Sequence, residues 1–341
     1  MDELYVLEPG STIRKDGDCL KIIRDGTVAA TIPAAGLKQL VMSGTASLSG
    51  AVLDFLITNR IDTVFMSPAG RFRARLLMDD PGHVQLRQQQ YLRLADTAFK
   101  LSVARTIVRE KLENQVRLLL RRASQYGAES LRVTAVQVKA LQQKLVGADD
   151  LDQVRGIEGY GAKLFYSVFG LLLRNDRFHF SGRNRRPPLD PVNALLSFVY
   201  TLLTNEVLNG IRCAGLDPYL GALHEVASGR PALACDLVEE WRILAERMVL
   251  TLINRRAIQP DDFVYRPGAE GVENGGRPVE MKPAVSRALI VAYHRQLEEK
   301  VWYPPTEMKT AVRVIIHSQC RRFAKGLAEG GTPYAPFRLP R

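Results

Sequence analysis

Two acidic residues three positions apart, Asp236 and Glu239, have the types and spacing that could support catalysis. On a helix, residues three apart project from the same side, so both carboxylates could contact one metal ion. Carboxylates hold hard divalent cations, which neutralise phosphate oxygens and activate an oxygen nucleophile. Such pairs are also common on solvated helix faces, but the residues from Cys235 to Trp241 are mostly apolar, which weakens that explanation.

His224 lies twelve positions before Asp236, in a segment, residues 216–225, that we expect to be helical. The turn at Gly229-Arg230-Pro231 could fold this histidine back toward the acid pair. A lone histidine is more often structural than a ligand, although a neutral imidazole can bind a metal or carry a proton. The sequence alone therefore leaves both roles open for His224.

Glu158 lies among three glycines, at positions 156, 159 and 161. Glycine has low helix propensity but permits close approach of another backbone. The approaching group could be a neighbouring helix or a nucleic-acid backbone, and the spacing does not choose between them. Glu158 is the third candidate acid.

A strongly basic segment spans residues 174–188 and contains one acid, Asp176. Its arginines are Arg174, Arg177, Arg183, Arg185 and Arg186. A guanidinium group can donate two parallel hydrogen bonds to a phosphate, so we interpret this segment as a DNA contact. We also predict that Arg242, which lies next to the acid pair in the sequence, contacts DNA. The alternative is a solvated loop that its interleaved phenylalanines anchor to the core.

The whole chain of 341 residues is basic, with 47 Lys and Arg against 36 Asp and Glu and a formal net charge of +11. Residues 1–95 contribute only +1 of this charge, so the excess lies in the remainder. That excess favours a polyanionic partner, without identifying it.

Several function classes are disfavoured. The four cysteines are scattered without metal-binding spacing, which argues against a zinc site or a disulfide framework. The sequence has no phosphate-binding GxxxxGK[ST] loop, no GxGxxG and no GxSxG. We expect a cytoplasmic protein with no membrane association, because no secretory leader or membrane-spanning apolar run is evident.

The N-terminal part predicts β-hairpins, since turn dipeptides at Asp16-Gly17 and Asp25-Gly26 separate short apolar runs. Strands are predicted at 19–23, 27–32, 63–66 and 71–77, and a short helix at 49–59. In the last strand Arg71, Arg73 and Arg75 alternate with apolar residues. This is typical of a half-buried strand, which we favour over a nucleic-acid face.

The pattern changes to helical periodicity from Tyr91 to Gln125. Further helices are predicted at 135–145, 151–173, 191–214, 216–228, 235–253, 284–300 and 306–328. Asp190 and Pro191 form a specific helix start. Pro260–Pro283 is expected to be a mobile loop. The predicted fold class is α+β with two domains: a small β-rich, β-sandwich-like domain at residues 1–85, a linker at 86–95, a larger all-α domain at 96–328 and a flexible tail at 329–341.

Four ordered segments resemble the CRISPR-associated spacer integrase family: Gly156–Gly159, Arg183–Leu203, Leu216–His224 and Asp236–Arg242. The resemblance extends over essentially the whole chain. It implies that the β-rich domain mediates dimerisation and that the helical domain is catalytic and binds DNA. It also implies that Glu158, His224 and Glu239 bind Mg²⁺ or Mn²⁺, and that Asp236 is a nearby acid needed for activity.

The family resemblance further implies a metal-dependent DNA endonuclease and integrase of CRISPR adaptation. It would join the 3′-hydroxyl ends of captured DNA to the leader-proximal repeat of a CRISPR array by transesterification. The implied partners are double-stranded DNA, a second copy in a homodimer, a small ferredoxin-like bridging protein and a motif-selecting CRISPR-associated nuclease. A branched-DNA repair nuclease and a catalytically silent DNA-binding scaffold remain as alternatives.

Overall fold

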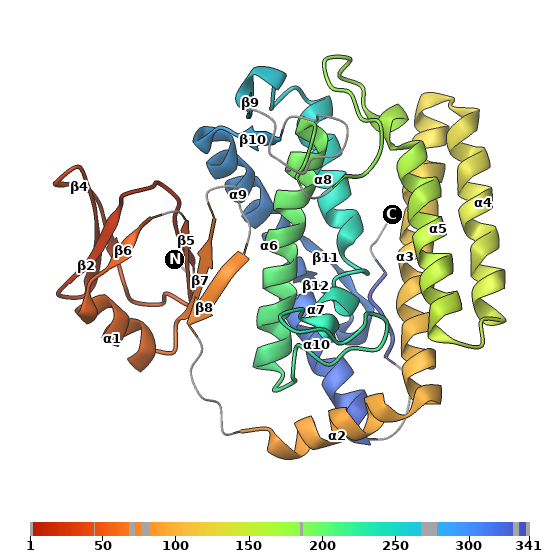
Figure 1. Ribbon diagram of the computed structural model, residues 1–341, viewed down its shortest axis with the longest axis horizontal. Coiled ribbons are helices and arrows are strands. Elements are labelled where there is room, and N and C mark those ends of the chain that lie inside the picture. The colour runs from red at the N-terminus through yellow and green to blue at the C-terminus, as the bar shows by residue number, and fades with distance from the viewer. Residues whose placement is uncertain are drawn as a thin grey trace. The chain divides into compact units, whose positions relative to one another are not determined.

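The structure is a computed structural model that describes residues 3–43, 45–67, 72–76, 82–184, 187–266, 278–329 and 334–338. Its internal contacts divide the chain into two compact units. One comprises Met1–Pro81 with Met281–Ala288, and the other comprises Gly82–Glu280 with Leu289–Arg341. The fold is mixed, with strands first and helices after them (Figure 1).

The first unit contains two four-stranded sheets and helix α1 (Gly50–Thr58). One sheet has the order β1 (Glu3–Val6), β5 (Gln39–Ser43), β7 (Asp62–Met66), β8 (Phe72–Leu76). The other has the order β4 (Thr27–Pro33), β3 (Cys19–Arg24), β2 (Thr12–Asp16), β6 (Ser47–Leu48). Residues of both sheets and of α1 share one hydrophobic core, which includes Val6, Leu20, Leu40 and Leu56.

The two predicted hairpin turns are confirmed. Gly17, Asp25 and Gly26 all have positive φ, as tight hairpin turns require, and β2, β3 and β4 pair antiparallel. The expectation that hairpins make up the whole N-terminal part is wrong, because β5 pairs parallel with both β1 and β7. Parallel neighbours need a crossover connection, and the chain between β5 and β7 supplies one that contains α1.

Arg75 supports the structural interpretation of the alternating arginines. Its side chain is 2% exposed and its Nε lies 3.0 Å from Oδ1 of Asp62 on the neighbouring strand β7. Arg73 is exposed, and Arg71 lies outside the described residues.

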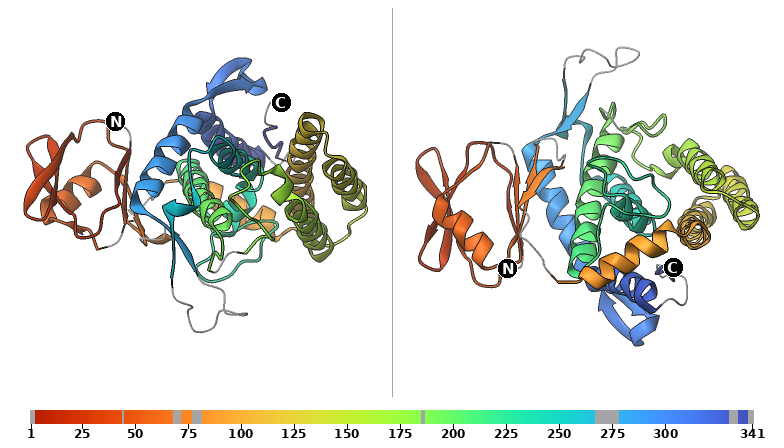
Figure 2. Two further views of the ribbon diagram at one scale, coloured as in Figure 1. Left: turned by 90° about the horizontal axis from the view of Figure 1, so that it is seen from above. Right: turned by 60° about the horizontal axis from the view of Figure 1, so that its bottom comes forward.

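The second unit is built mainly from helices (Figures 1 and 2). In chain order they are α2 (Val84–Ala95), α3 (Thr97–Tyr126), α4 (Glu129–Val146), α5 (Leu151–Ser167), α6 (Pro191–Cys213), α7 (Ala232–Leu237), α8 (Arg242–Asn254), α9 (Pro283–Glu298) and α10 (Val312–Glu329), with α9 beginning in the first unit. Short 3₁₀ turns occur at Phe169–Leu172, Pro260–Asp262 and Pro304–Thr306. Helices α3, α4 and α5 lie side by side in Figures 1 and 2.

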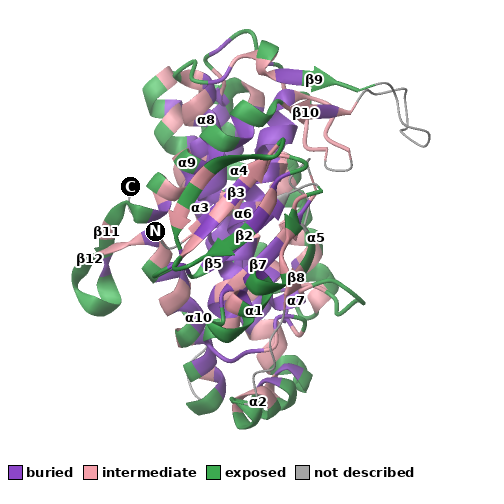
Figure 3. Cartoon of the chain, turned by 90° about the vertical axis from the view of Figure 1, so that its left-hand side faces the viewer, coloured by how far each residue is buried: buried purple, intermediate pink, exposed green. Residues whose placement is uncertain are grey.

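Helix α6 is the central helix of this unit, and most of its residues are buried (Figure 3). Asp190 caps it as predicted, because its Oδ1 accepts a hydrogen bond of 2.8 Å from the backbone N–H of Asn193. Among the described helices, α6 alone is long and apolar enough to cross a membrane. Because 72% of its apolar stretch is buried inside the fold, a core helix accounts for that composition.

The prediction of an all-α second part is wrong in detail. Two small two-stranded sheets occur, one formed by β9 (Phe263–Tyr265) and β10 (Val279–Met281), the other by β11 (Lys300–Tyr303) and β12 (Met308–Ala311). The predicted helix at 306–328 therefore starts only at Val312. Likewise β9 and β10 fall in the predicted mobile loop, and the linker predicted at 86–95 is helical within α2. Asp96 ends α2 and caps α3, so the single stretch predicted from Tyr91 is two helices.

The C-terminal residues 334–338 pack against the second unit, which corrects the prediction of a flexible tail for this part. Tyr334 and Phe337 are buried, and the Phe337 ring stacks on the indole of Trp241 with 5.5 Å between centroids. Arg338 forms a bidentate ion pair with Glu110. Its Nε donates to Oε1 at 3.0 Å and its Nη2 donates to Oε2 at 2.9 Å. The aromatic residues of this segment indicate in the sequence that it can pack against a core. The Gly- and Pro-rich composition around them led instead to the prediction of a tail.

Candidate active site

His224 and Asp236 are in direct contact. Nδ1 of His224 lies 2.7 Å from Oδ1 of Asp236, whose side chain is fully buried. Because a carboxylate accepts hydrogen bonds, Nδ1 carries the proton and Nε2 keeps its lone pair. A carboxylate that fixes the tautomer of an imidazole in this way is typical of metal-binding histidines.

The segment before His224 is a loop, so the helix predicted at 216–228 is wrong. The Asp236 carboxylate accepts backbone N–H groups from three consecutive residues, at 2.5 Å from Ala222, 3.0 Å from Leu223 and 2.9 Å from His224. All three N–H groups point to the Asp236 side chain. They are therefore not available for the backbone hydrogen bonds of a helix. Gly221 permits the close approach, since a Cβ there would lie 2.4 Å from Oδ2 of Asp236.

The predicted helix at 235–253 is interrupted, and this changes how the acid pair is arranged. Asp236 lies on α7, whereas Glu239 lies in the turn between α7 and α8. The two carboxylates therefore have different partners: Asp236 contacts the His224 loop, and Glu239 contacts Lys111 and Arg242. The i, i+3 spacing predicted that both acids share one helix face, and the structure instead gives them separate surroundings.

Glu158 and Glu239 converge on one cationic group. The Lys111 ammonium of α3 forms ion pairs with Glu158 of α5 and, at 2.5 Å, with Oε2 of Glu239. Lys111 and Glu239 have side chains only 7% and 3% exposed, whereas Glu158 is 24% exposed. A buried cation between two carboxylates offsets the electrostatic repulsion between them, which would otherwise be large in a low-dielectric environment.

Arg242 neutralises the other side of Glu239. Its Nη1 lies 2.8 Å from Oε1 of Glu239, and its guanidinium lies over the ring of Tyr200, 4.3 Å from the centroid. Burial by itself raises the pKa of Glu239, but the charges of Arg242 and Lys111 together hold it below its ordinary value. Glu239 is therefore ionised at neutral pH.

Arg155 links the two halves of the site. Its Nε donates to the carbonyl of Leu223 at 3.1 Å, and its Nη1 pairs with Glu225 at 2.8 Å. Because Arg155 lies one turn before Glu158 on α5, it ties the helix that carries Glu158 to the loop that carries His224. Of the three neighbouring glycines, Gly161 provides room for Leu112 of α3, while Gly156 and Gly159 face open space.

The donor set suits a hard divalent cation chemically, since two carboxylates converge and an imidazole nitrogen is available. As placed, however, no three His, Cys, Asp or Glu side chains of the described residues form a ready set of metal ligands. The Lys111 ammonium holds the carboxylates together instead. The observation that fits a bound cation is that Glu158 and Glu239 both contact the Lys111 ammonium.

The predicted basic segment divides into different environments. Arg183 donates to Asn193 at 2.7 Å and to Ser197 at 3.1 Å, so it joins the segment to α6. Arg177 pairs with Asp261 at 3.1 Å, and Arg174 stacks on Tyr126. Arg185 and Arg186 lie outside the described residues. Phe178 is buried and Phe180 contacts Phe169, as expected of phenylalanines that anchor a loop.

Lys111 is the residue that the sequence analysis missed. A signal was present, because it shares a helical face with Ala104, Ile107, Val108 and Leu118, all of which are buried. A lysine on an otherwise apolar stripe is rarely buried without an acidic partner. That rule alone predicts a buried ion pair for Lys111 but does not name the acids.

Comparison with known proteins identifies the family. Residues 4–294 match the model of the CRISPR associated protein Cas1 family. A CRISPR-associated endonuclease Cas1 of Moorella thermoacetica is 36% identical over 99% of this chain and 98% of its own. One of Chlorobaculum tepidum is 35% identical, again over 99% of this chain and 98% of its own.

Solved structures share the fold. A Cas1 protein from Thermotoga maritima superposes with a TM-score of 0.80 at 24% identity, covering 98% of this chain and 99% of that one. A casposase bound to an integration product gives a TM-score of 0.85 at 21% identity, covering 100% and 95%. The identities are low enough that these two show the fold alone. From the family model and the full-length relatives, this chain belongs to the CRISPR associated protein Cas1 family.

Proposed function

We propose that this chain is a metal-dependent DNA endonuclease and integrase of CRISPR adaptation. In this proposal it joins the 3′-hydroxyl ends of captured DNA fragments to the leader-proximal repeat. Full-length relatives named CRISPR-associated endonucleases support the endonuclease part. The observation that carries the proposal is the pairing of His224 with Asp236 beside two carboxylates that share one cationic partner.

Glu158, His224 and Glu239 are the residues that would hold Mg²⁺ or Mn²⁺. Such an ion, when bound, supplies Lewis-acid stabilisation of a phosphodiester and activation of a hydroxyl group. Asp236 is then a positioning residue, because the hydrogen bonds of its carboxylate within the described residues go to the imidazole and to the backbone N–H groups of the loop. Its contacts fix both the tautomer and the place of His224.

The positively charged side chains of the site can offset the negative charge of the reacting phosphodiester. Arg242 and Lys111 balance the ionised carboxylates, and we propose that they also contact nonbridging phosphate oxygens of the bound DNA. Arg242 is held between Glu239 and the Tyr200 ring, so little reorganisation is required as charge develops. Attack by a DNA hydroxyl gives strand joining, and attack by water at the same site gives cleavage.

The assembly is also part of the proposal. We infer a homodimer in which the N-terminal β-rich part mediates dimerisation and the helical part is catalytic and binds double-stranded DNA. A small ferredoxin-like protein would bridge two dimers, and a motif-selecting nuclease could supply the fragments. Related proteins support partners of these kinds, since one structural neighbour is part of a Cas6-RT-Cas1–Cas2 complex and one relative is a Cas4/Cas1 fusion.

Single substitutions of the three proposed ligands test the site. Glu158→Ala, His224→Ala and Glu239→Ala should each abolish joining of a labelled fragment to a repeat-bearing supercoiled plasmid while DNA binding is retained. A matched control is Glu129→Gln, because Glu129 is an exposed acid at the start of α4. It should join DNA as the unmodified protein does.

Three other outcomes would point elsewhere. Unchanged joining in any of the three ligand variants would contradict the metal assignment. Cleavage of branched DNA without joining, in the presence of the bridging partner, would favour a repair nuclease. DNA binding with neither activity, with or without Mg²⁺ or Mn²⁺, would favour a silent scaffold in which Lys111 permanently neutralises the carboxylates.

A further inference from the structure

The Lys111 ammonium lies between the two carboxylates that are proposed to hold the metal ion. It contacts Oε1 of Glu158 and lies 2.5 Å from Oε2 of Glu239. The three side chains come from different elements: Lys111 from α3, Glu158 from α5 and Glu239 from the turn between α7 and α8. A metal ion held by both acids needs the same two carboxylates, and two cations so close together repel each other. The ammonium and the metal ion therefore compete.

The elements that carry these groups are also held together by contacts that do not involve the ammonium. Leu112 of α3 packs closely on Gly161 of α5, where a Cβ would lie 2.4 Å from Cδ2 of Leu112. Nδ2 of Asn114 donates to the carbonyl of Glu240, in the turn between α7 and α8, at 3.2 Å. A lysine side chain has a flexible four-carbon stem with three donors at its end. Lys111 can therefore change partners by side-chain rotation while the backbones stay in place.

The charges around Lys111 are balanced. The two carboxylates face two cations, Lys111 and Arg242, and the charge of Asp236 is stabilised separately by three backbone N–H groups. A divalent ion adds two positive charges, while Arg242 stays on Oε1 of Glu239 at 2.8 Å and Lys111 remains tethered to α3. In a mostly buried site such an excess of positive charge lowers metal affinity unless an anion is bound nearby.

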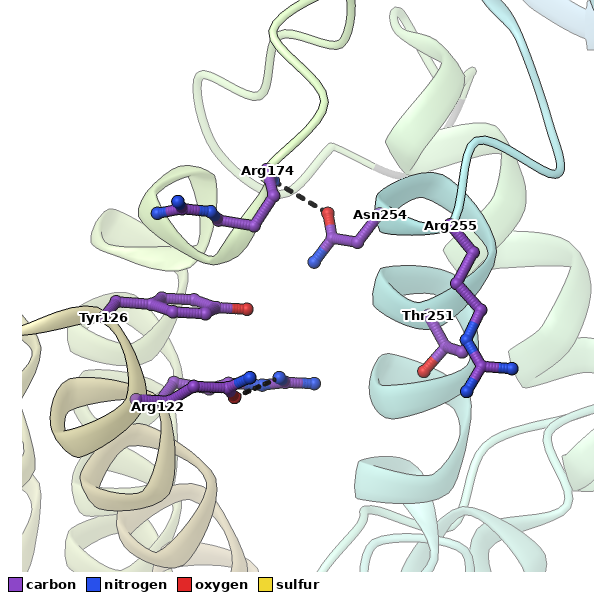
Figure 4. Close-up of a pocket in the computed structure, with 7 residues that line it drawn as sticks. Arg122, Tyr126, Arg174, Thr251, Asn254 and Arg255 are labelled. Carbon is purple, nitrogen blue, oxygen red and sulfur yellow. Dashed lines mark hydrogen bonds between the residues drawn. The ribbon is translucent and has the colours of Figure 1, made fainter.

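The other acids of α3 and α8 already have partners among the described residues. Both oxygens of Glu110 bind Arg338, and Oε1 of Glu113 lies 3.0 Å from Nε of Arg117. Glu246 accepts the hydroxyls of two buried tyrosines. Further along the same helices, the lining of a cavity of about 510 Å³ contains no acid (Figure 4). A displaced ammonium therefore needs an anion from a ligand, and a phosphodiester is the anion that the proposed function supplies.

We propose that Lys111 exchanges partners: it yields Glu158 and Glu239 to the metal ion and transfers its ammonium to a DNA phosphate. Each ligand then favours binding of the other, because the exchange frees the ammonium for DNA and the phosphate offsets the added positive charge. Such coupling between two ligands is necessarily reciprocal. Without DNA, Lys111 keeps metal affinity low, so the metal-loaded site forms mainly on DNA. The inference rests on the proposed function for the metal site and for the identity of the anion.

Two neutral substitutions, Lys111→Met and Lys111→Gln, test the exchange without relying on catalysis. Methionine keeps most of the apolar stem, and glutamine keeps a hydrogen-bond donor for one carboxylate. Lys139→Met is the matched control, because Lys139 is exposed on α4 and its loss removes the same charge away from the cluster. Binding of Mn²⁺ without DNA is measured from the electron paramagnetic resonance signal of the free ion. Melting temperatures with and without Mn²⁺ show that each variant is folded.

Both Lys111 variants should bind Mn²⁺ about 10-fold more tightly than Lys139→Met, because the competing cation is gone. A lysine that only holds the carboxylates in place would give the opposite sign. Affinity for a labelled duplex without 3′-hydroxyl groups, which cannot be joined, is then compared in Mn²⁺ and in EDTA by fluorescence anisotropy. Mn²⁺ should tighten DNA binding about 10-fold in the control and about 3-fold or less in the Lys111 variants. The smaller effect remains because a phosphate can also contact the ion directly.

The inference is overturned if the folded Lys111 variants bind Mn²⁺ no more tightly than Lys139→Met, or if Mn²⁺ tightens their DNA binding as much as it does for that control. A variant that folds only in Mn²⁺ supports the exchange, because the ion then replaces the ammonium, and variants that stay unfolded in Mn²⁺ contradict it. Failure of the proposed function looks different. In that case the unmodified protein would join no DNA in Mn²⁺ or Mg²⁺, while the effect of Lys111 on Mn²⁺ affinity would persist.

Discussion

At the scale of single residues, the arrangement of the proposed site depends on one fully buried carboxylate, that of Asp236. Asp236 organises three backbone N–H groups and the imidazole of His224. Its burial is tolerable because both oxygens accept hydrogen bonds, which offsets the cost of desolvation. In the proposed function, Asp236 therefore positions His224.

Asp236→Asn should weaken metal binding and the joining rate by about 10- to 100-fold, because the amide can donate to Nδ1 and so select the wrong imidazole tautomer. Mn²⁺ affinity measured by calorimetry, together with the pH profile of joining, reports this effect. Asp149→Asn is the control, since Asp149 is exposed and lies outside both the proposed site and the basic segment. A variant with normal Mn²⁺ affinity and normal joining would show that Asp236 has no positioning role.

The sequence indicated candidate residues that the structure brings together, but it did not predict how they are arranged. Glu158, Glu239 and Lys111 meet in one cluster, and Asp236 contacts His224. The i, i+3 argument assumed an unbroken helix, and the turn between α7 and α8 invalidated it. Such a turn depends on which buried groups need partners, and these are provided by distant parts of the chain.

At the scale of elements, the C-terminal segment 334–338 supports the turn that carries Glu239. Glu240 accepts the hydroxyl of Tyr334 and, at 2.8 Å, the backbone N–H of Phe337. Trp241 stacks on Phe337. A segment that composition alone would assign to a tail is thus packed against the residues next to the site.

Phe337→Ala should lower the free energy of unfolding by about 3 kcal/mol, because a buried aromatic ring and its stacking contact with Trp241 are lost. Urea denaturation followed by tryptophan fluorescence measures the change. Ala335→Ser, an exposed neighbour in the same segment, should be neutral. Equal midpoints for the two variants would mean that the segment contributes nothing to stability.

At the scale of the whole molecule, the net charge of +11 is distributed unevenly, because residues 1–95 contribute only +1 of it. Charge of this kind favours association with DNA but does not stabilise the fold, since like charges repel. Stability depends instead on buried contacts, and one of these should respond to pH.

His294 should make the protein sensitive to acid. Burial and the neighbouring Arg313, whose Nη2 lies 2.9 Å from Nδ1, lower its pKa from 6.5 to about 4. Between these values the unfolded chain binds a proton that the folded chain does not, so stability is lost as the pH falls from 6.5 toward 4. The slope stays below about 1.4 kcal/mol per pH unit, because solvent screens the partly exposed ring.

The measurement is the free energy of unfolding at a series of pH values for the unmodified chain and for His294→Gln. The glutamine keeps an acceptor for Arg313 but does not titrate, so its acid dependence should be shallower. Identical pH profiles would contradict the assigned direction of the shift.

The sequence by itself determined that a strand-rich part precedes a mainly helical part, the two hairpin turns, the capped start of α6, the candidate acids and the family resemblance. These follow from local preferences: glycine at positive φ, a carboxylate at a helix start and the period of apolar residues. The tertiary structure alone decided the parallel strand pairing, the break between α7 and α8, the loop around Asp236 and the role of Lys111. Each of these depends on satisfying a buried polar group or sheet edge with a partner distant in sequence, which no local pattern specifies.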